Sequence, residues 1–194
     1  MVTTIRPLRD SEVWPAASTL ATAFESYPWT RWTVPAEDHA GRLAELQRLY
    51  LEHALGHGVV LTTEDLDGVI ALMPPAPPLP SDSVQQRIAA LHGDRVGRIL
   101  SMNAPGAPDG FWTVETLGVA PGSRGAGIGS SLLASGLAAV PRAAGFALQT
   151  SEERNVRLYR RAGFEVAATT AVAPEVTVYS MTMTKDSHPC APSD

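Results

Sequence analysis

Apolar residues recur at helical spacing in some segments of the chain and form short β-branched or alternating runs in others. Between residues 37 and 55, for example, Leu43, Leu46 and Tyr50 repeat at the spacing of one helix face. The same criterion predicts helices over residues 11–24, 37–55, 83–102, 128–140 and 155–162. It predicts strands over residues 3–6, 59–63, 69–73, 111–119, 146–150, 164–172 and 176–184.

Glycine and proline mark the breaks between these elements. Asp67-Gly68 between two strands is a hairpin signal, and the prolines of residues 74–80 forbid a helix or a ladder there. Gly93 and Gly97 weaken the third helix and are expected to split it. Hairpins come early and late, and strands alternate with helices between them. We therefore expect an α/β (α+β) fold with a central mixed, mostly antiparallel sheet flanked by helices.

The composition is that of an ordinary folded domain. The 194 residues are 44% apolar and 18% charged, which fits one domain over residues 1–184 and a flexible tail over residues 185–194. The net charge of −5 argues against broad electrostatic binding of nucleic acid. A single cysteine, Cys190, excludes an internal disulfide, and no histidine has metal-ligand spacing with it, so we expect no metal.

The hydropathy of the chain bears on its location. Residues 1–10 contain no apolar run, so we expect no signal peptide. No segment approaches the roughly 18 uninterrupted apolar residues that predict a membrane span. A cytoplasmic protein without a membrane partner, as a monomer or a homodimer, is the expectation.

The segment 116–133 is typical of a strand, a glycine-rich loop and a helix in succession. Gly125, Gly127 and Gly129 alternate directly after Arg124. Backbone N–H groups at the start of a helix, with no side chains in the way, form a site for phosphate or pyrophosphate. The alternative is that these glycines serve only close packing.

Two common phosphate-binding schemes do not fit this loop. A P-loop requires a lysine after its last glycine, and the only lysine of the chain is Lys185. The dinucleotide pattern requires a third glycine at a position occupied here by Ser130 or Leu132.

The residues from Arg124 to Gly129 do fit the pattern Arg-x-x-Gly-x-Gly, and a second block runs from Asn155 through Tyr159 to Gly163-Phe164. Together these blocks resemble the GNAT superfamily of N-acetyltransferases, and the resemblance extends over residues 3–184. It implies a splayed sheet, acetyl-CoA as co-substrate, and direct attack of an amine on the thioester in a ternary complex.

The resemblance also implies which residues hold the co-substrate. The pyrophosphate cradle would consist of Arg124, Gly125, Ala126, Gly127, Ile128 and Gly129. Leu117, Gly118 and Val119 would offer backbone groups to the pantetheine and the thioester carbonyl. Gly118 either eases the splay or is a small residue facing a neighbour. Asn155 either bonds the pantetheine or caps its helix.

Two residues are the catalytic candidates. Tyr159 stands where the family keeps its general acid, and its alternative role is that of a core aromatic. The family's usual glutamate base is replaced by Gln149, which cannot accept a proton. Glu115 is the substitute candidate, because strand alternation would place it on the same face as Leu117. A solvated carboxylate, a water chain or an amine of low pKa are the alternatives.

Within the superfamily the chain is most similar to puromycin N-acetyltransferases, through residues 23–28 and other segments of the N-terminal half. Tyr27 and Trp32 are expected to line a pocket for an aromatic or apolar amine, the alternative being an aromatic core cluster. The small-molecule amine could be an antibiotic or an aminonucleoside. Two other functions stay open: a protein or peptide N-terminal acetyltransferase, and a catalytically silent CoA-binding module.

Overall fold

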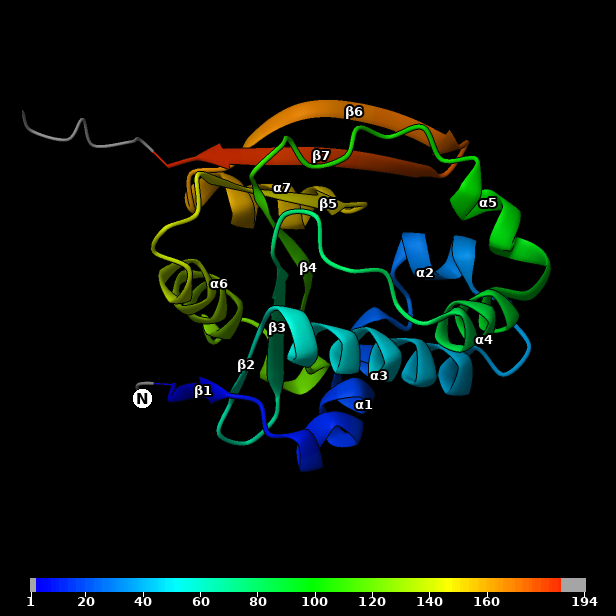
Figure 1. Ribbon diagram of the computed structural model, residues 1–194, viewed down its shortest axis with the longest axis horizontal. Coiled ribbons are helices and arrows are strands. Elements are labelled where there is room, and N and C mark those ends of the chain that lie inside the picture. Colours follow the sequence, from blue (N-terminus) through cyan, green and yellow to red (C-terminus); the bar gives the residue numbers. More distant parts are fainter. Residues whose placement is uncertain (1–2, 186–194) are drawn as a thin grey trace, which may run out of the picture.

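Seven strands form one sheet in the order β1-β2-β3-β4-β5-β7-β6, in a computed structural model that describes residues 3–185 (Figure 1). The strands are β1 Ile5–Pro7, β2 Val59–Thr63, β3 Gly68–Met73, β4 Trp112–Val119, β5 Gly145–Thr150, β6 Glu165–Ala173 and β7 Val176–Thr184. Every neighbouring pair is antiparallel except β4 and β5, which are parallel. The expectation of a mixed, mostly antiparallel sheet is therefore confirmed.

Helices cover both faces of this sheet (Figure 1). They are α1 Val13–Phe24, α2 Pro28–Thr33, α3 His39–His57, α4 Asp82–His92, α5 Val96–Leu100, α6 Ile128–Ala139 and α7 Glu153–Arg161. One core cluster joins α6 and α7 to the sheet, and a second joins α1 and α3 to its other face. All six residues of β3 are buried, as expected for a strand between two layers, and this explains its unbroken apolar sequence.

The helix boundaries follow local signals, with one exception. The predicted 83–102 helix is divided at Gly93, which adopts a positive φ of 55° between α4 and α5. The predicted elements include no helix around Pro28. The structure has α2 there instead, with Pro28 in its first turn. Proline is favoured at that position because its missing N–H would have no partner in any case.

None of the helices in residues 3–185 has the length and apolar character needed to cross a membrane. Cys190 and almost all of the predicted tail lie outside the described residues.

Candidate active site

Strands β4 and β5 pair only at their beginnings. The two register pairs are Trp112↔Phe146 and Thr113↔Ala147, and no further pair follows in the described chain. Beyond Thr113, the edge of β4 that faces β5 therefore carries backbone N–H and C=O groups without a strand partner. Such groups are free to bind a ligand, and the divergence is the splay that the sequence resemblance implies.

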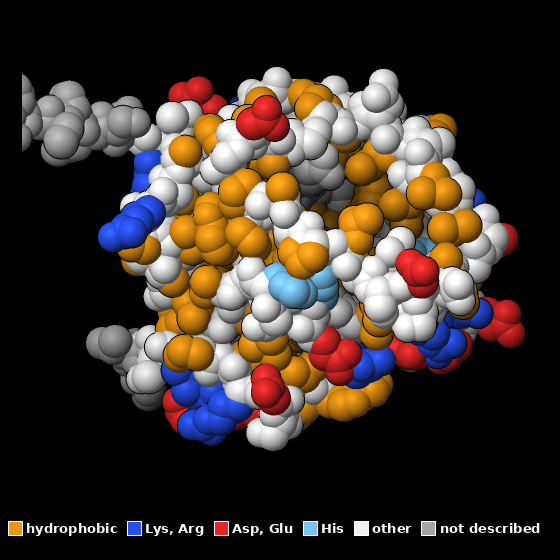
Figure 2. All heavy atoms as spheres, in the orientation of Figure 1, with side chains coloured by type: hydrophobic (Ala, Val, Ile, Leu, Met, Phe, Trp, Pro, Cys, Tyr) orange, Lys and Arg blue, Asp and Glu red, His pale blue; other side chains and the backbone are white. Residues whose placement is uncertain are grey.

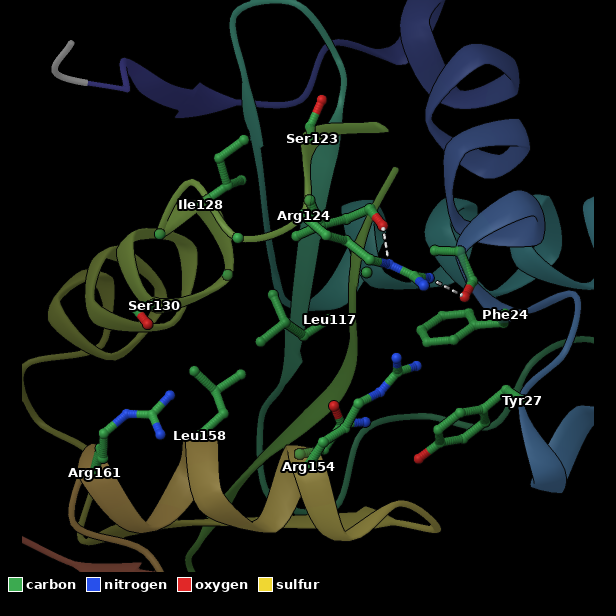
Figure 3. A pocket seen from close by; sticks show the side chains of 17 residues that line it. Phe24, Tyr27, Leu117, Ser123, Arg124, Ile128, Ser130, Arg154, Leu158 and Arg161 are labelled. Atoms are coloured by element: carbon green, nitrogen blue, oxygen red, sulfur yellow. Dashed lines mark hydrogen bonds between the residues drawn. The ribbon is translucent and has the colours of Figure 1, made fainter. Parts of the chain in front are cut away.

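A cavity of about 430 Å³ lies at the diverging ends of these strands (Figure 3). Its walls are the end of α1, the end of β4, the glycine-rich loop and α7. The predicted cofactor residues that line it are Leu117, Gly118, Val119, Arg124, Gly125, Gly127, Ile128, Gly129 and Asn155. Ala126 belongs to the same loop but does not line the cavity. We call this space the loop cavity.

The glycine-rich loop presents consecutive N–H groups to the loop cavity. Gly125 and Gly127 have φ values of +85° and +80°, in the left-handed region that favours glycine. Gly127 is the N-cap of α6, and its carbonyl accepts the first helical bond, from the Ser131 amide at 3.0 Å. In the described part of the chain, the N–H groups of residues 125–130 have no hydrogen-bond acceptor. Free N–H groups in series at a helix start attract an anion.

Three arginines, Arg124, Arg154 and Arg161, line the loop cavity (Figure 3). The Arg124 guanidinium donates to the carbonyls of Ala23 at 2.8 Å and Val119 at 3.4 Å, so it joins α1 to the loop rather than reaching outward. Arg154 and Arg161 come from α7 and were not singled out from the sequence. No acidic residue lines this cavity among residues 3–185.

Tyr27 connects the corner between α1 and α2 to the end of β5. Its hydroxyl lies 2.7 Å from Thr150 Oγ1 and accepts a hydrogen bond from the Ser151 amide at 2.7 Å. Asn155 Nδ2 donates to the same Thr150 hydroxyl at 3.3 Å. The N-cap of α7 is Glu152, so Asn155 does not cap the helix. This network holds the α1 and α7 walls of the loop cavity together.

The structure does not bring Tyr27 and Trp32 into one pocket. Tyr27 lines the loop cavity. Trp32 packs against Trp29, with ring centroids 5.4 Å apart, and the Arg98 guanidinium lies 5.9 Å from its ring. The aromatic segment is therefore divided between the loop cavity and a surface cluster.

Gly118 allows α1 to approach β4 closely. A Cβ at this position would lie 2.7 Å from Leu20 Cδ2 and 3.3 Å from Ala23 Cβ. The reading of Gly118 as a small residue facing a neighbour is therefore the one that the geometry supports.

Tyr159 belongs to the core cluster that α6 and α7 form with the sheet. Its ring meets Phe164 at an edge-on angle, 5.8 Å between centroids, and it lines neither cavity. Burial, and secondarily the charge of Tyr27 in its ionised form, raises the pKa of Tyr159 above its usual range. The phenol therefore keeps its proton at any ordinary pH.

Glu115 forms a bulge in β4. Thr116 pairs with Ala71 and Val114 pairs with Leu72, which leaves Glu115 without a partner on β3. Strict alternation would have put Glu115 on the face of Leu117, but the extra residue of the bulge places Glu115 on the opposite face of the sheet. Leu117 packs into the α6 side of the sheet, whereas Glu115 lines a separate cavity beside α3.

This second cavity, of about 470 Å³, lies between α3, α4, the start of β4 and two loops. We call it the proline cavity, because residues 74–80 form much of its wall. Protein surrounds Glu115 although its side chain is accessible through the cavity, and this burial raises the pKa of the carboxyl above its usual value.

Gln149 anchors a loop instead of facing a cavity. Its Nε2 donates to the Pro105 carbonyl at 3.0 Å, and Ser180 Oγ donates to the same carbonyl at 3.2 Å. The α5–β4 loop is thereby attached to β5 and β7. Residues 3–185 contain no group of three or more His, Cys, Asp or Glu side chains that could hold a metal ion.

Comparisons with known proteins agree with this geometry. Residues 85–166 match the family model of the acetyltransferase (GNAT) domain. A structure described as histone acetyltransferase HPA2 and related acetyltransferase, from Corynebacterium glutamicum, superposes with a TM-score of 0.76 at 21% identity, over 98% of this chain and 100% of that one.

Two further structures were determined with a CoA ligand. The acetyltransferase yncA from Salmonella typhimurium, with acetyl-CoA, has a TM-score of 0.56 and 18% identity, over 100% of this chain and 99% of that one. The NatC complex with Gag peptide and CoA has a TM-score of 0.53 and 15% identity, over 95% and 99% of the two chains. The seven-stranded splayed sheet of this protein is thus the GNAT fold. Nothing in these matches singles out puromycin N-acetyltransferases.

The left-handed conformation of Gly127 makes a measurable prediction about stability. Gly127→Ala should lower the free energy of unfolding by about 1–2 kcal/mol, the usual cost of a left-handed non-glycine residue. Gly129→Ala is the matched control, because Gly129 lies in the helix and its Cβ would meet neighbours at 3.8 and 3.9 Å. Urea unfolding should show this control unchanged or slightly stabilised. Equal losses in both variants would contradict the assignment.

The raised pKa of Glu115 predicts that this residue lowers the free energy of unfolding at high pH but not at low pH. Because the folded pKa lies above the unfolded one, Glu115 favours folding at low pH, and this contribution is lost as the pH rises through the folded value. Glu115→Gln removes the titration. The melting temperature of the variant minus that of the wild type should therefore increase from pH 4 towards pH 8. Thermal unfolding at stepwise pH measures it, and a difference independent of pH would refute the expectation.

Proposed function

We propose that this protein is an acetyl-CoA-dependent N-acetyltransferase that transfers acetyl to the amine of a small molecule by direct attack in a ternary complex. The observation that carries the proposal is the loop cavity. It combines the free N–H groups of residues 125–130 with the unpaired edge of β4 in one space. A diphosphate and an amide-containing arm attached to it require these two kinds of surface, side by side.

The charges and shape of the loop cavity fit CoA. Its lining contains three arginines and, among residues 3–185, no carboxylate. Nothing lies within 4 Å of a Cβ added at Gly125 or Gly127, so phosphate oxygens can reach the main chain there. Arg154 and Arg161 would neutralise phosphate charge. The free edge of β4 and Asn155 would bind the pantetheine amides and orient the thioester carbonyl.

Acetyl transfer requires one proton to leave the amine and one to reach the sulfur. As the N–C bond forms and the C–S bond breaks, Glu115 would accept the proton of the ammonium. Its raised pKa makes it a better base near neutral pH than a glutamate of ordinary pKa. Tyr159 lines neither cavity, so its proposed role requires the bound thioester to extend to the phenol; there Tyr159 would donate its proton or a hydrogen bond to the thiolate. Its raised pKa makes complete transfer harder, so hydrogen bonding to sulfur is the larger part of the proposed role.

The proline cavity favours a small acceptor over a polypeptide. Residues 74–80 and 107–111 form walls on two sides of it, and α3 closes a third. A volume of about 470 Å³ is in the range of small-molecule sites, about 300–1,000 Å³. An antibiotic or aminonucleoside amine, as the likeness to puromycin N-acetyltransferases implies, fits this description.

A comparison of CoA with pantetheine tests the proposed function. Pantetheine lacks the diphosphate, so CoA should bind more tightly by calorimetry. Gly127→Ala should weaken CoA at least about tenfold and pantetheine little, because its methyl group enters the phosphate cradle. Thiol release with acetyl-CoA and a panel of amines then measures transfer. Equal affinity for CoA and pantetheine would overturn the proposal, and CoA binding without transfer to any amine would favour the silent module.

Replacement of Tyr159 by phenylalanine tests the proposed acid. Tyr159→Phe keeps the ring that packs against Phe164, so melting temperature and CoA affinity should be retained. The turnover number should fall by roughly 10²–10⁴, the range typical of a general acid. Steady-state kinetics with the best amine of the panel measures this, and Tyr179→Phe on β7 is the control. Unchanged turnover would assign Tyr159 to the core alone.

A further inference from the structure

The proline cavity differs from the loop cavity in its chemistry. Most of its wall is apolar: Leu49, Met73, Ile88, Phe111 and the prolines of residues 74–80. Figure 2 shows this face of the molecule hollowed, with hydrophobic side chains around the hollow. A ligand that fills this space must therefore present an apolar body.

The proline cavity contains two carboxylates and no arginine or lysine of the described chain. Glu115 and Asp109 line it, together with one further titratable side chain, that of His53. Both side chains are accessible to solvent; Glu115 lies on β4 with protein around it, and Asp109 lies on the loop before β4. A carboxylate in an apolar surrounding attracts a cation more strongly than a solvated one does, because water screens it less. The proline cavity therefore selects for a positive charge close to Glu115.

A second polar group, Tyr50, lines the same cavity. Tyr50 and Glu115 line the same cavity, and burial together with the charge of Glu115 raises the pKa of Tyr50 to about 12. The Tyr50 hydroxyl lies 3.4 Å from His92 Nε2, and His92 Nδ1 lies 2.8 Å from the Thr33 carbonyl.

The hydrogen-bond chain through His92 fixes the direction of the Tyr50 hydroxyl. A carbonyl only accepts, so His92 Nδ1 carries the proton, and burial lowers the pKa of His92, which keeps the ring neutral. Nε2 is then an acceptor, and Tyr50 donates to it. The remaining lone pairs of the Tyr50 oxygen stay available to accept a hydrogen bond from a ligand in the cavity.

We propose that the proline cavity binds an amine that is a single cation in solution and carries an apolar, aryl- or alkyl-sized body. Its ammonium would be held between the Glu115 carboxylate and the Tyr50 oxygen, and its body would lie on Ile88, Met73 and the prolines. The inference rests on the proposed function and names the acceptor class for it. It also gives Tyr50 a role in substrate binding, whereas the sequence pattern indicates only that Tyr50 lies on one face of a helix.

The same arguments exclude other acceptor classes. Phosphorylated amines and amino acids would bring an anionic group next to the carboxylates of Glu115 and Asp109. Polyhydroxylated amines would place hydroxyl groups against walls that are largely apolar, which costs binding energy. The ammonium of an apolar amine meets Glu115 and Tyr50, and such an amine brings no other polar group into the cavity.

The proposed acceptor class is tested by measuring amine binding to the protein with CoA present. No turnover occurs, since CoA carries no acetyl group. The probes are 2-phenylethylamine, the neutral 2-phenylethanol, phenylalanine and glucosamine, each titrated by calorimetry. The phenylethylamine should bind at least about tenfold more tightly than the other three, as expected for a hydrogen-bonded charge. Extension to 3-phenylpropylamine should tighten binding by roughly three- to fourfold, the effect of one buried methylene.

Variants separate the contributions of the two polar groups. Glu115→Gln should remove most of the preference for amine over alcohol, and Tyr50→Phe should weaken the amine roughly three- to tenfold and the alcohol little. Asp109→Asn should have a smaller effect than Glu115→Gln, because the proposed position of the ammonium is between Glu115 and Tyr50. Glu175→Gln, on the turn between β6 and β7, is the unaffected control.

The outcomes distinguish this inference from the proposed function. If CoA binds but amine and alcohol bind equally, or glucosamine or a short peptide is preferred, the acceptor class is wrong and the transferase proposal stands. If CoA itself does not bind, the proposed function is refuted, and the acceptor class with it. Melting temperatures confirm that the variants fold, and if Glu115→Gln binds the amine as the wild type does, the assignment is overturned.

Discussion

The unpaired edge of β4 is the constraint on which the site depends. An open strand edge inside a protein leaves polar groups without partners, which is unfavourable. Packing contacts must therefore keep the two strands from pairing along their whole length. Here the two strands close at Trp112↔Phe146, where the ring of Phe111 occupies the space that a side chain at Gly145 would need. At the other end, α1 lies against Gly118 and Tyr27 bonds to the end of β5. The gap is therefore built into the packing of the protein.

The bulge at Glu115 gives the same strand two opposite electrostatic environments. Leu117 and the residues after it face the loop cavity with its arginines, whereas Glu115 faces the proline cavity with its carboxylates. The two residues are about 6–7 Å apart along the strand. A protein whose net charge is only −5 thus separates its charges locally, with arginines lining one cavity and carboxylates lining the other.

Local signals in the sequence predicted much of this arrangement, and the remainder depended on distant contacts. The glycine loop and the split of the third long helix followed from backbone conformations that only particular residues adopt. The bulge could not be predicted, because alternation within one strand contains no information about register with β3. The loop-cavity arginines on α7 were missed for a similar reason: exposed arginines on a short polar helix are common, and only tertiary packing aims them at a cavity.

Gln149 has a structural role at the position where the sequence resemblance implies a glutamate base. Its amide is bound to the Pro105 carbonyl, and that bond attaches the loop before β4 to β5 and β7. A carboxylate at position 149 would repel the same carbonyl oxygen and release the loop, which goes on to form part of the proline cavity. The amide of Gln149 therefore helps to hold that loop in place, and the bulge brings Glu115 into the cavity that the loop lines.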